Sequence, residues 1–591
     1  MTVSMTVSGA PEIDPVKREL IKNALVTIAD NMIALVIRTS RSVVVKNNLD
    51  FSASVLNAKG EMVAQGLSLP GHLGATGPAL RGCLDHFGDD IRQGDIFCNN
   101  DPYAGASHLN DVFMFRPVFH DGELIGFLSI ILHHTDMGGR VPGGNAPDST
   151  EIYQEGLRIP PLKIMENDKP NETLFRIIRN NVRVSDTVVG DMQSQIASLL
   201  AAETELRRVI ADYGVDTVRL YMNDLIDYAE KLTRAGIAAL PDGTGEFTDW
   251  IDDDGTGSAP VKIHVKLTVK GDSAVIDFTG TSPQTSGAIN PNKYFAIGLS
   301  LAVMRTVLDP SIPANAGFNR AVEVITPEGC FVNPRFPAPV GARGLAGFRV
   351  RHAVSGALAM LLPDKVGACV GGSEFALVLA GYPKGRKPFL TLEFHNVTGI
   401  GGGPDRDGQD GGPYGLVNIA NVPVEVIEAE GPVRVECYEF LPDTEGAGRY
   451  RGALGLVREY RLLEDEALIQ LRSDRQLNPP YGLFGGEPSA PGRIIMNPGR
   501  ADERVAPSKF IAKMARDEVI RAEMPGAGGY GDPLERDAAA VAEDVRQMKI
   551  SIERARDVYG VVVDPKTFAV DAAATAKRRS ESRAPAELAD A

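Results

Sequence analysis

Histidine and aspartate side chains are concentrated in one part of this sequence, where they could bind a divalent metal ion. Six of the nine histidines lie between His72 and His134. Two polar segments stand out in this stretch, NNDPYAGASHLND at 99–111 and HHTDMGG at 133–139. Neutral imidazole nitrogens and anionic carboxylate oxygens together form a donor set that offsets the charge of such an ion. The sequence therefore predicts a metal site formed by loops in this stretch.

Apolar runs flank both segments and predict the strands that position them. Residues 95–98 and 112–119 enclose the first segment, and residues 124–132 lead directly into the second. A further strand at 51–56 follows Asp50 and begins a hairpin. Because loops at the ends of neighbouring strands can gather around one point, the polar side chains are expected to meet there.

The rest of the chain predicts an α+β architecture, with a mixed strand-rich body, N-terminal and central helices, and a helical C-terminal extension. An amphipathic helix is expected over 15–39 after the N-cap Asp14, and further helices over 174–239. Residues 261–277 predict short strands around Gly271-Asp272, and residues 340–530 predict strands punctuated by Gly and Pro.

A chain of 591 residues is too long for one simple core, so several domains are expected. Changes in composition and predicted secondary structure along the chain predict four domains. These are an α/β metal-site domain at 1–240, an α+β middle domain at 241–339, a Gly/Pro-rich β-dominated domain at 340–533, and a charged helical extension with a flexible tail at 534–591.

Composition and charge exclude several classes of protein. A net charge of −16 without a basic face argues against nucleic-acid binding. No run approaches about 18 uninterrupted apolar residues, which argues against a membrane span, and the N-terminus carries no secretory signal. The five scattered cysteines form no CxxC pair, as expected for free thiols in a reducing cytoplasm. The sequence also lacks GxxxxGK followed by Ser or Thr, so we expect no nucleotide site in this chain.

Eight motifs, in order along the chain, resemble those of the hydantoinase B/oxoprolinase family. They are DFSAS at 50–54, NNDPYAGASHLND at 99–111, HHTDMGG at 133–139, IYQEGLRIPP at 152–161, GDMQSQ at 190–195, DFTGTSPQTSGAINPN at 277–292, EGAGRYRGALG at 445–455 and GGYGDPLERD at 528–537. The resemblance covers residues 14–540, and the combination is specific, whereas any single motif is weak.

The resemblance implies one subunit of a two-part enzyme. The family includes the B-type chain of ATP-dependent hydantoinases, the matching half of 5-oxoprolinase, similarly built lactamases and the large subunit of acetone and acetophenone carboxylases. A hydantoinase A type partner would bind ATP and phosphorylate the amide oxygen of a cyclic amide. This chain would then hydrolyse the activated C–N bond with a water whose pKa a divalent metal lowers. The resemblance thus implies a hydrolase in a cytoplasmic hetero-oligomer.

The same resemblance implies the ligands of that metal. Three or four residues of the following pool would bind it: Asp50, His108, Asp111 and His133. Manganese and zinc suit a mixed nitrogen and oxygen donor set, and iron is a third candidate. The alternative is that both histidines make ordinary hydrogen bonds within polar loops.

Three further residues are candidates for proton transfer or for orienting the ligands. Asp136 is interpreted as a general base, a ligand or a turn residue, and Glu155 is a proton-transfer residue by resemblance. If His133 faces the site, His134 faces the other way, where it would be structural or orient a ligand. His72 lies in an expected Gly-rich loop that could approach the site.

Two other functions stay open. The first is the metal subunit of a ketone carboxylase, which would join an enolate to CO2 at the same site. The large subunits of such carboxylases are longer, so the length of this chain favours the hydrolase. The second is a non-catalytic scaffold for the A-type partner, which the presence of the metal-type residues disfavours. Stoichiometric metal in the pure chain would separate the scaffold from both enzymes.

Overall fold

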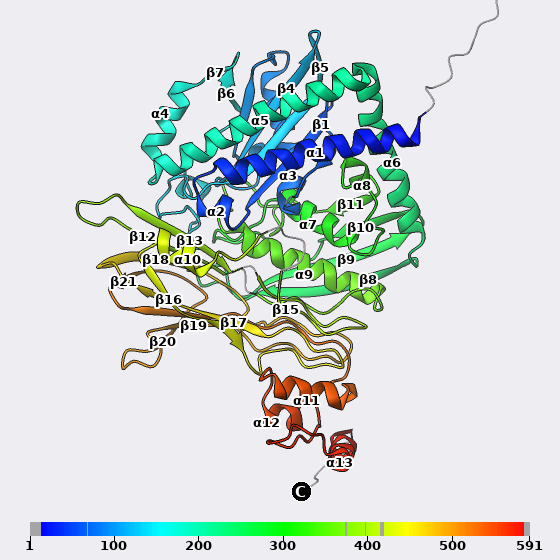
Figure 1. Ribbon diagram of the computed structural model, residues 1–591, viewed down its shortest axis with the longest axis vertical. Coiled ribbons are helices and arrows are strands. Elements are labelled where there is room, and N and C mark those ends of the chain that lie inside the picture. Colours follow the sequence, from blue (N-terminus) through cyan, green and yellow to red (C-terminus); the bar gives the residue numbers. More distant parts are fainter. Residues whose placement is uncertain (1–12, 68, 373–374, 396, 414–418, 584–591) are drawn as a thin grey trace, which may run out of the picture.

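Several β-sheets and the helices packed on them make up the molecule, which is elongated in Figure 1. The structure is a computed structural model that describes residues 13–67, 69–372, 375–395, 397–413 and 419–583. A seven-stranded sheet with its helices lies at one end, and the other sheets lie below it. The C-terminal helices form the opposite end. The predicted α+β class, with N-terminal, central and C-terminal helices, is confirmed.

The seven-stranded sheet is antiparallel and has the strand order β2-β1-β5-β4-β3-β6-β7. Its strands are β1 (Phe51–Asn57), β2 (Met62–Gln65), β3 (Ile96–Asn99), β4 (Asp111–His120), β5 (Glu123–His133), β6 (Leu162–Glu166) and β7 (Lys169–Pro170). The four strands predicted around Asp50 and the two polar segments are confirmed, each to within one residue at either end.

Helices cover both faces of this sheet, so its central strands are buried on both sides. On one face, α1 (Pro15–Thr39) and α5 (Ser185–Tyr213) share a core with Val112 of β4. On the other face, α3 (Pro70–Phe87) packs over Phe113 of the same strand. The shorter or more distant elements of this region are α2 (Val43–Lys46), α4 (Glu172–Asn181), α6 (Val215–Ala238) and the 3-10 turns η1 (Pro102–Ala104) and η2 (Ile152–Gln154).

Helix α1 begins where the sequence predicts, because the Asp14 side chain accepts a hydrogen bond from the backbone N–H of Val16. Among the described residues it is the one helix long and apolar enough to cross a membrane. Its apolar face is buried in the core of the first sheet through Ile21, Leu25, Ile28, Ala29, Met32, Ile33 and Val36. A core helix with such a face meets the same test of length and composition.

The predicted Gly-rich loop around His72 is wrong, because these residues form the first turn of α3. Glycine serves close packing here. A Cβ added to Gly74 would lie 2.7 Å from the Cα of Gly298 in α7 (Lys293–Arg305). The two glycines therefore let two helices approach closely, and at this place a glycine-rich sequence marks a helix contact instead of a loop.

A mixed four-stranded sheet comes next in the chain, in the order β11-β10-β9-β8. Its elements are β8 (Gly243–Ile251), β9 (Val261–Lys270), β10 (Ser273–Asp277), β11 (Val322–Ile325), α7 (Lys293–Arg305), α8 (Ala316–Asn319) and α9 (Arg343–Leu361). The strand pair predicted around Gly271 is confirmed as the β9–β10 hairpin.

Helix α9 corrects the prediction that residues 340–530 form strands throughout. It packs against β8 and β9, and Leu345, Val350 and Leu358 belong to the core of that sheet. Nearly all of its side chains are buried. A helix that is buried on every side, as α9 is with its buried arginines, has no amphipathic period, so the sequence pattern does not reveal it.

Two facing antiparallel sheets form the β-rich part of the chain. One has the order β13-β12-β18-β21 and the other the order β16-β17-β22-β19-β20. They share a core that includes Leu377 and Tyr460. The elements are β12 (Phe375–Gly381), β13 (Phe389–His395), β14 (Val397–Gly399), β15 (Asp410–Pro413), α10 (Val424–Glu430), β16 (Val433–Leu441), β17 (Gly455–Leu462), β18 (Glu466–Arg472), β19 (Arg493–Met496), β20 (Arg504–Ala506), β21 (Lys509–Ala515) and β22 (Val519–Glu523).

The C-terminal extension is helical, as predicted. It contains η3 (Pro533–Glu535), α11 (Ala538–Arg546), α12 (Ile552–Asp557) and α13 (Ala572–Arg583). Buried arginines attach it to the β-rich part: Arg536 pairs with Asp407 and Asp544, and Arg451 pairs with Asp544. The prediction set no start for the flexible tail. Of the Ala-, Lys- and Arg-rich end of the chain, residues 572–583 form α13, and residues 584–591 lie outside the described residues. The division into four domains stays a prediction.

Candidate metal centre

Strand pairing brings three strand ends together at one edge of the seven-stranded sheet. Asp111, the first residue of β4, is the register partner of His133, the last residue of β5. Strand β1 begins directly after Asp50 and pairs with the end of β5. The backbone N–H of His133 donates to the carbonyl oxygen of Asp50 at 3.2 Å. His108 precedes β4 by only three residues, so its loop reaches the same edge.

The donor atoms of His108, Asp111 and His133 converge in the protein interior. One donor atom from each side chain lies within 4.8 Å of the other two. Nε2 of His108 is 3.1 Å from Oδ1 of Asp111, and the two imidazole rings have centroids 5.1 Å apart. All three side chains are buried. The structure thus brings three of the four predicted ligands together.

The hydrogen bonds of these side chains fit a metal ion. Nδ1 of His108 donates to the carbonyl oxygen of Gly341 at 3.1 Å, so Nε2 keeps its lone pair. Three atoms are buried and have no hydrogen-bond partner among the described residues, namely His108 Nε2, Asp111 Oδ1 and His133 Nδ1. Buried polar atoms are normally paired, and a bound cation would pair all three at once.

The electrostatics favour the protonation states that bind a metal. Burial lowers the pKa of His108 to about 4 and the pKa of His133 well below its usual range. Burial alone would raise the pKa of Asp111, but Arg343 and the neighbouring histidines hold it well below the ordinary value. The site therefore presents neutral imidazoles and an ionised carboxylate, which are the ligand forms of these groups.

Asp50, the fourth predicted ligand, is linked to the cluster through His72. Nε2 of His72 lies 3.3 Å from Oδ2 of Asp111 and 3.7 Å from Oδ1 of Asp50. Its Nδ1 lies 3.2 Å from the hydroxyl oxygen of Ser52. Burial raises the pKa of Asp50 to about 6, against the opposing effect of His72. His72 therefore touches both carboxylates, and α3 holds it there.

Arg343 is a site residue that sequence reasoning missed. Its Nη2 pairs with Oδ2 of Asp111, and its Nε donates to the hydroxyl of Ser107 at 2.5 Å. Its guanidinium also lies 4.3 Å from the ring centroid of Phe295. Arg343 is far from Asp111 in sequence, and the one local signal is an arginine opening an otherwise apolar segment, GLAGF.

His134 faces away from the cluster, as strand alternation predicts. Its Nε2 donates to Oε1 of Gln195 on α5 at 3.1 Å. His134 is the donor, because the Gln195 amide nitrogen already donates to the carbonyl oxygens of Val112 and Ile130 and the amide oxygen is left to face His134. This contact ties the end of β5 to a helix on the sheet face. A catalytic role for His134 stays a prediction.

Asp136 lies close to the cluster in sequence but makes other contacts. Its Oδ1 accepts hydrogen bonds from the backbone N–H of Gly143 and from Nη1 of Arg183, both at 3.0 Å. Its Oδ2 accepts from the backbone N–H of Arg183 at 2.6 Å. Both oxygens are therefore engaged in holding the loop after β5, which is what a turn residue does.

Glu155 is linked to His108 through the backbone of Gly341. Its Oε1 accepts from the backbone N–H groups of Val340 and Gly341 at 2.8 and 2.7 Å, and the Gly341 carbonyl accepts from His108. Its Oε2 is buried without a hydrogen-bond partner among the described residues. Burial raises the pKa of Glu155 to about 8, despite the two backbone hydrogen bonds. A buried carboxyl that titrates near neutrality is suited to proton transfer.

Known proteins of similar sequence extend over nearly the whole chain. The caprolactamase beta chain of Pseudomonas jessenii is 33% identical over 583 residues, which are 96% of this chain and 99% of that protein. The B-type chain of a putative D-/L-hydantoinase of Pseudomonas sp. strain NS671 is 31% identical, over 93% of this chain and 96% of that protein.

Solved structures agree with this similarity. The crystal structure of the ATP-dependent caprolactamase from Pseudomonas jessenii matches with a TM-score of 0.89 at 31% identity, covering 96% of this chain and 100% of that chain. Acetone carboxylase in its nucleotide-free form matches with a TM-score of 0.90 over 96% of this chain and 83% of that chain. At 20% identity, the second match shows a shared fold alone. The family model for hydantoinase B/oxoprolinase matches residues 14–533, and the chain therefore belongs to the hydantoinase B/oxoprolinase family.

Proposed function

We propose that this chain is the metal-binding B-type subunit of an ATP-dependent cyclic amidase, which hydrolyses a C–N bond of a hydantoin, oxoproline or lactam ring. The observation that carries this proposal is the buried convergence of unpartnered donor atoms from His108, Asp111 and His133 in a member of this family. Relatives named caprolactamase and hydantoinase support a cyclic amide as the substrate class.

The residues of the cluster would hold a manganese or zinc ion, with iron as a further candidate. His108, Asp111 and His133 would be ligands. Asp50, which His72 links to Asp111, would complete the set. When bound, such an ion lowers the pKa of a water and polarises a carbonyl oxygen.

The residues around the cluster would prepare this chemistry by fixing protonation states. The Gly341 carbonyl keeps the proton of His108 on Nδ1, and Arg343 keeps Asp111 ionised. Glu155 would take the proton that the attacking water loses and return it to the departing nitrogen, because its Oε2 lacks a partner among the described residues and its pKa is about 8. Asp136 and His134 would support the loop and the strand end.

An A-type partner would supply the activation. A ring amide is a poor electrophile, so we expect the partner to phosphorylate the amide oxygen with ATP. Relatives whose names give them as the B or beta component of an enzyme support a hetero-oligomer, and this sequence lacks a phosphate-loop motif of its own. We expect the complex to act in the cytoplasm and to bind neither nucleic acid nor membranes.

Metal analysis is the decisive first experiment. We expect about one equivalent of manganese or zinc per purified chain and its loss in the double variant His108→Ala/His133→Ala. His120→Ala is the matched control, because His120 lies at the half-exposed end of β4, away from the cluster. Folded wild-type protein without metal would overturn the proposal and favour the scaffold function.

Product analysis separates the hydrolase from the carboxylase. The family resemblance left a ketone carboxylase as the alternative, and the two reactions give different products. The purified complex would be incubated with ATP and either a lactam or hydantoin, or acetone with bicarbonate. We expect ring-opened product in the first mixture only. Carboxylated ketone in the second mixture would contradict the assignment.

A further inference from the structure

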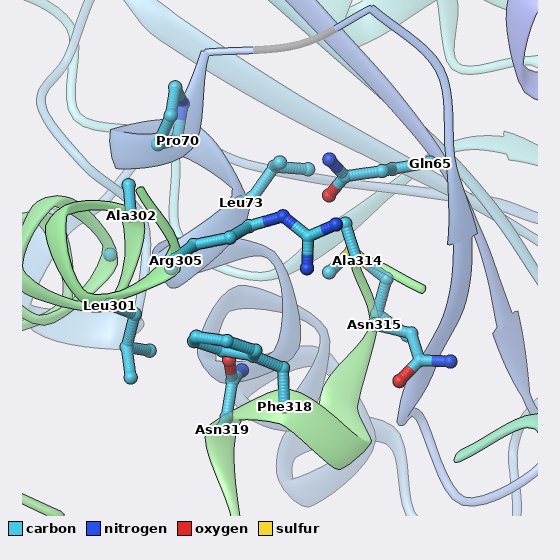
Figure 2. A pocket seen from close by; sticks show the side chains of 13 residues that line it. Gln65, Pro70, Leu73, Leu301, Ala302, Arg305, Ala314, Asn315, Phe318 and Asn319 are labelled. Carbon is cyan, nitrogen blue, oxygen red and sulfur yellow. The ribbon is translucent and has the colours of Figure 1, made fainter. Parts of the chain in front are cut away.

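A second pocket lies between the first turn of α3 and the C-terminal end of α7 (Figure 2). Its volume is about 90 Å³. Leu73, Leu301 and Phe318 form its apolar walls, and the carboxamides of Gln65 and Asn319 are part of its lining. A small concave site with mostly apolar walls and a few polar groups is typical of ligand pockets.

Arg305 extends into this pocket and is the one charged residue among those that line it. Its Nη2 donates to the carbonyl oxygens of Pro310 and Ile312. Its Nη1 is buried and has no acceptor among the described residues. Burial lowers the pKa of Arg305, and no acidic group opposes that effect. The guanidinium therefore lacks a carboxylate partner in the described part of the chain.

A second arginine of this region has its charge offset by carboxylates, in contrast to Arg305. Arg320, just after α8, pairs with Glu61, Asp227 and Glu230. Arg305 has two carbonyl oxygens, the ring face of Phe318 at 5.6 Å and the negative end of the α7 dipole to offset its charge, but no carboxylate among the described residues. Because arginine stays protonated, the partial burial of Arg305 without an anion is unfavourable. An anionic ligand would remove that cost.

We propose that this pocket binds a short-chain monocarboxylate. The carboxylate would pair with the Arg305 guanidinium, and the aliphatic tail would contact Leu73, Leu301 and Phe318. A volume near 90 Å³ is small for a ligand pocket, which suits short carboxylates such as acetate, propionate and butyrate. The apolar walls disfavour phosphate and sulfate, whose oxygens all need donors.

The pocket is separate from the metal centre, but both are lined by residues from the start of α3. Leu73 and Gly74 line the pocket, and the preceding residue, His72, contacts Asp50 and Asp111. Since carboxylates also bind metal ions, the two sites must be distinguished. Binding is therefore measured on the complete chain after the metal has been removed by chelation, and again on His108→Ala/His133→Ala.

Calorimetric titration with acetate, propionate, butyrate and hexanoate tests the proposal. We expect saturable binding at one site per chain, about three- to fourfold tighter with each methylene up to butyrate, and no further gain for hexanoate. Propionamide, which has the same shape without the charge, should bind at least about tenfold more weakly. The absence of saturable binding by wild-type chain would overturn the proposal.

Three variants identify the site. Arg305→Met should weaken propionate binding at least about tenfold, whereas Arg320→Met is the matched control and should leave binding unchanged. Ala302→Leu would fill the pocket while keeping Arg305, so it decides the question if Arg305→Met does not fold. Wild-type affinity in both Arg305→Met and Ala302→Leu would place the ligand elsewhere and refute the proposal.

Discussion

At the scale of single residues, the candidate centre depends on contacts that decide which atom of each ligand faces the cluster. The Gly341 carbonyl accepts a hydrogen bond from Nδ1 of His108 and leaves Nε2 for the cluster. Arg343 and His72 contact Oδ2 of Asp111 and leave Oδ1 for the cluster. Loss of a group that orients a ligand in this way commonly weakens metal binding by about 10- to 100-fold.

Glu155 gives a residue-scale prediction that separates proton transfer from positioning. In Glu155→Gln, the side-chain oxygen can still accept from Val340 and Gly341, so we expect the metal content to be retained. Turnover by the complex should fall by about 10²–10⁴-fold, because the amide cannot carry the proton. Metal analysis and kcat are measured on the same sample. Wild-type turnover in this variant would leave Glu155 a positioning residue only.

At the scale of elements, helix contacts place His72 against the strand ends. The first turn of α3 carries His72, and the close approach of Gly74 to Gly298 fixes α3 against α7. The orientation of a residue that touches two candidate ligands thus depends on a packing contact between two helices.

Gly74→Ala is expected to destabilise the fold by about 1–3 kcal/mol, because its Cβ would lie 2.4 Å from the backbone oxygen of Tyr294 and must displace it. Gly77→Ala on the same helix is the control. Its Cβ would meet nothing closer than 3.9 Å, and the gain in helix propensity is offset by the restriction before Pro78. Urea unfolding should show a change within about 1 kcal/mol for this variant. Equal stability of the two variants would contradict the packing argument.

Strands β13 and β17 give a pH prediction, since Glu393 faces Arg458 at 3.5 Å between the two facing sheets. Burial raises the pKa of Glu393 from 4.5 to about 8, and Arg458 offsets this only in part. The folded state thus favours the protonated acid. The contribution of Glu393 to stability is therefore complete below about pH 4.5 and is lost as the pH rises through about 8.

Glu393→Gln should therefore unfold at higher urea concentration than wild type above pH 8 and at a similar concentration near pH 4.5. Above pH 8, the difference in unfolding free energy between the two proteins should reach about a few kcal/mol. This is the order of magnitude expected for a pKa shift of this size. Unfolding of the two proteins, both without metal, is compared at matched pH values. A pH-independent difference would argue against a raised pKa.

At the scale of the whole molecule, buried ion pairs hold the middle sheet to the β-rich part. Arg475, which follows β18, donates to both carboxylate oxygens of Asp249 on β8 at 2.7 and 2.8 Å. Arg349 of α9 pairs with Asp474 at 2.9 Å. Asp252 accepts backbone hydrogen bonds from the loop that follows Arg475. These contacts fix how two separately built cores meet.

Asp249→Ala is expected to destabilise the protein by about 3–5 kcal/mol, because it leaves Arg475 buried without its carboxylate. Asp465→Ala removes an exposed partner of Arg516, with Asp465 87% exposed, and should change stability by at most about 1 kcal/mol. Both values come from urea unfolding. A small effect for Asp249→Ala would show that this buried pair does not fasten the two parts.

Local patterns were enough to predict the strands and the polar segments at their ends. Alternation and turn residues are short-range properties, so β1, β4 and β5 appear within one residue of their predicted bounds. The same patterns misled the prediction of α3 and α9. Helix α3 is rich in glycine because a second helix approaches it, and α9 has no exposed polar face because it is buried on every side.

The sequence by itself determined the composition of the candidate centre and the strand ends that carry it. His108, Asp111 and His133 lie within 26 residues of one another, and one hairpin brings them together. Only the tertiary structure showed that His72 contacts Asp50 and Asp111, and only it revealed Arg343 and the Glu155–Gly341 contact. It also showed that the Asp136 carboxylate pairs with Arg183. The physical reason is that these contacts join helices, loops and sheet edges far apart in the chain, and no periodicity or spacing records which of them meet.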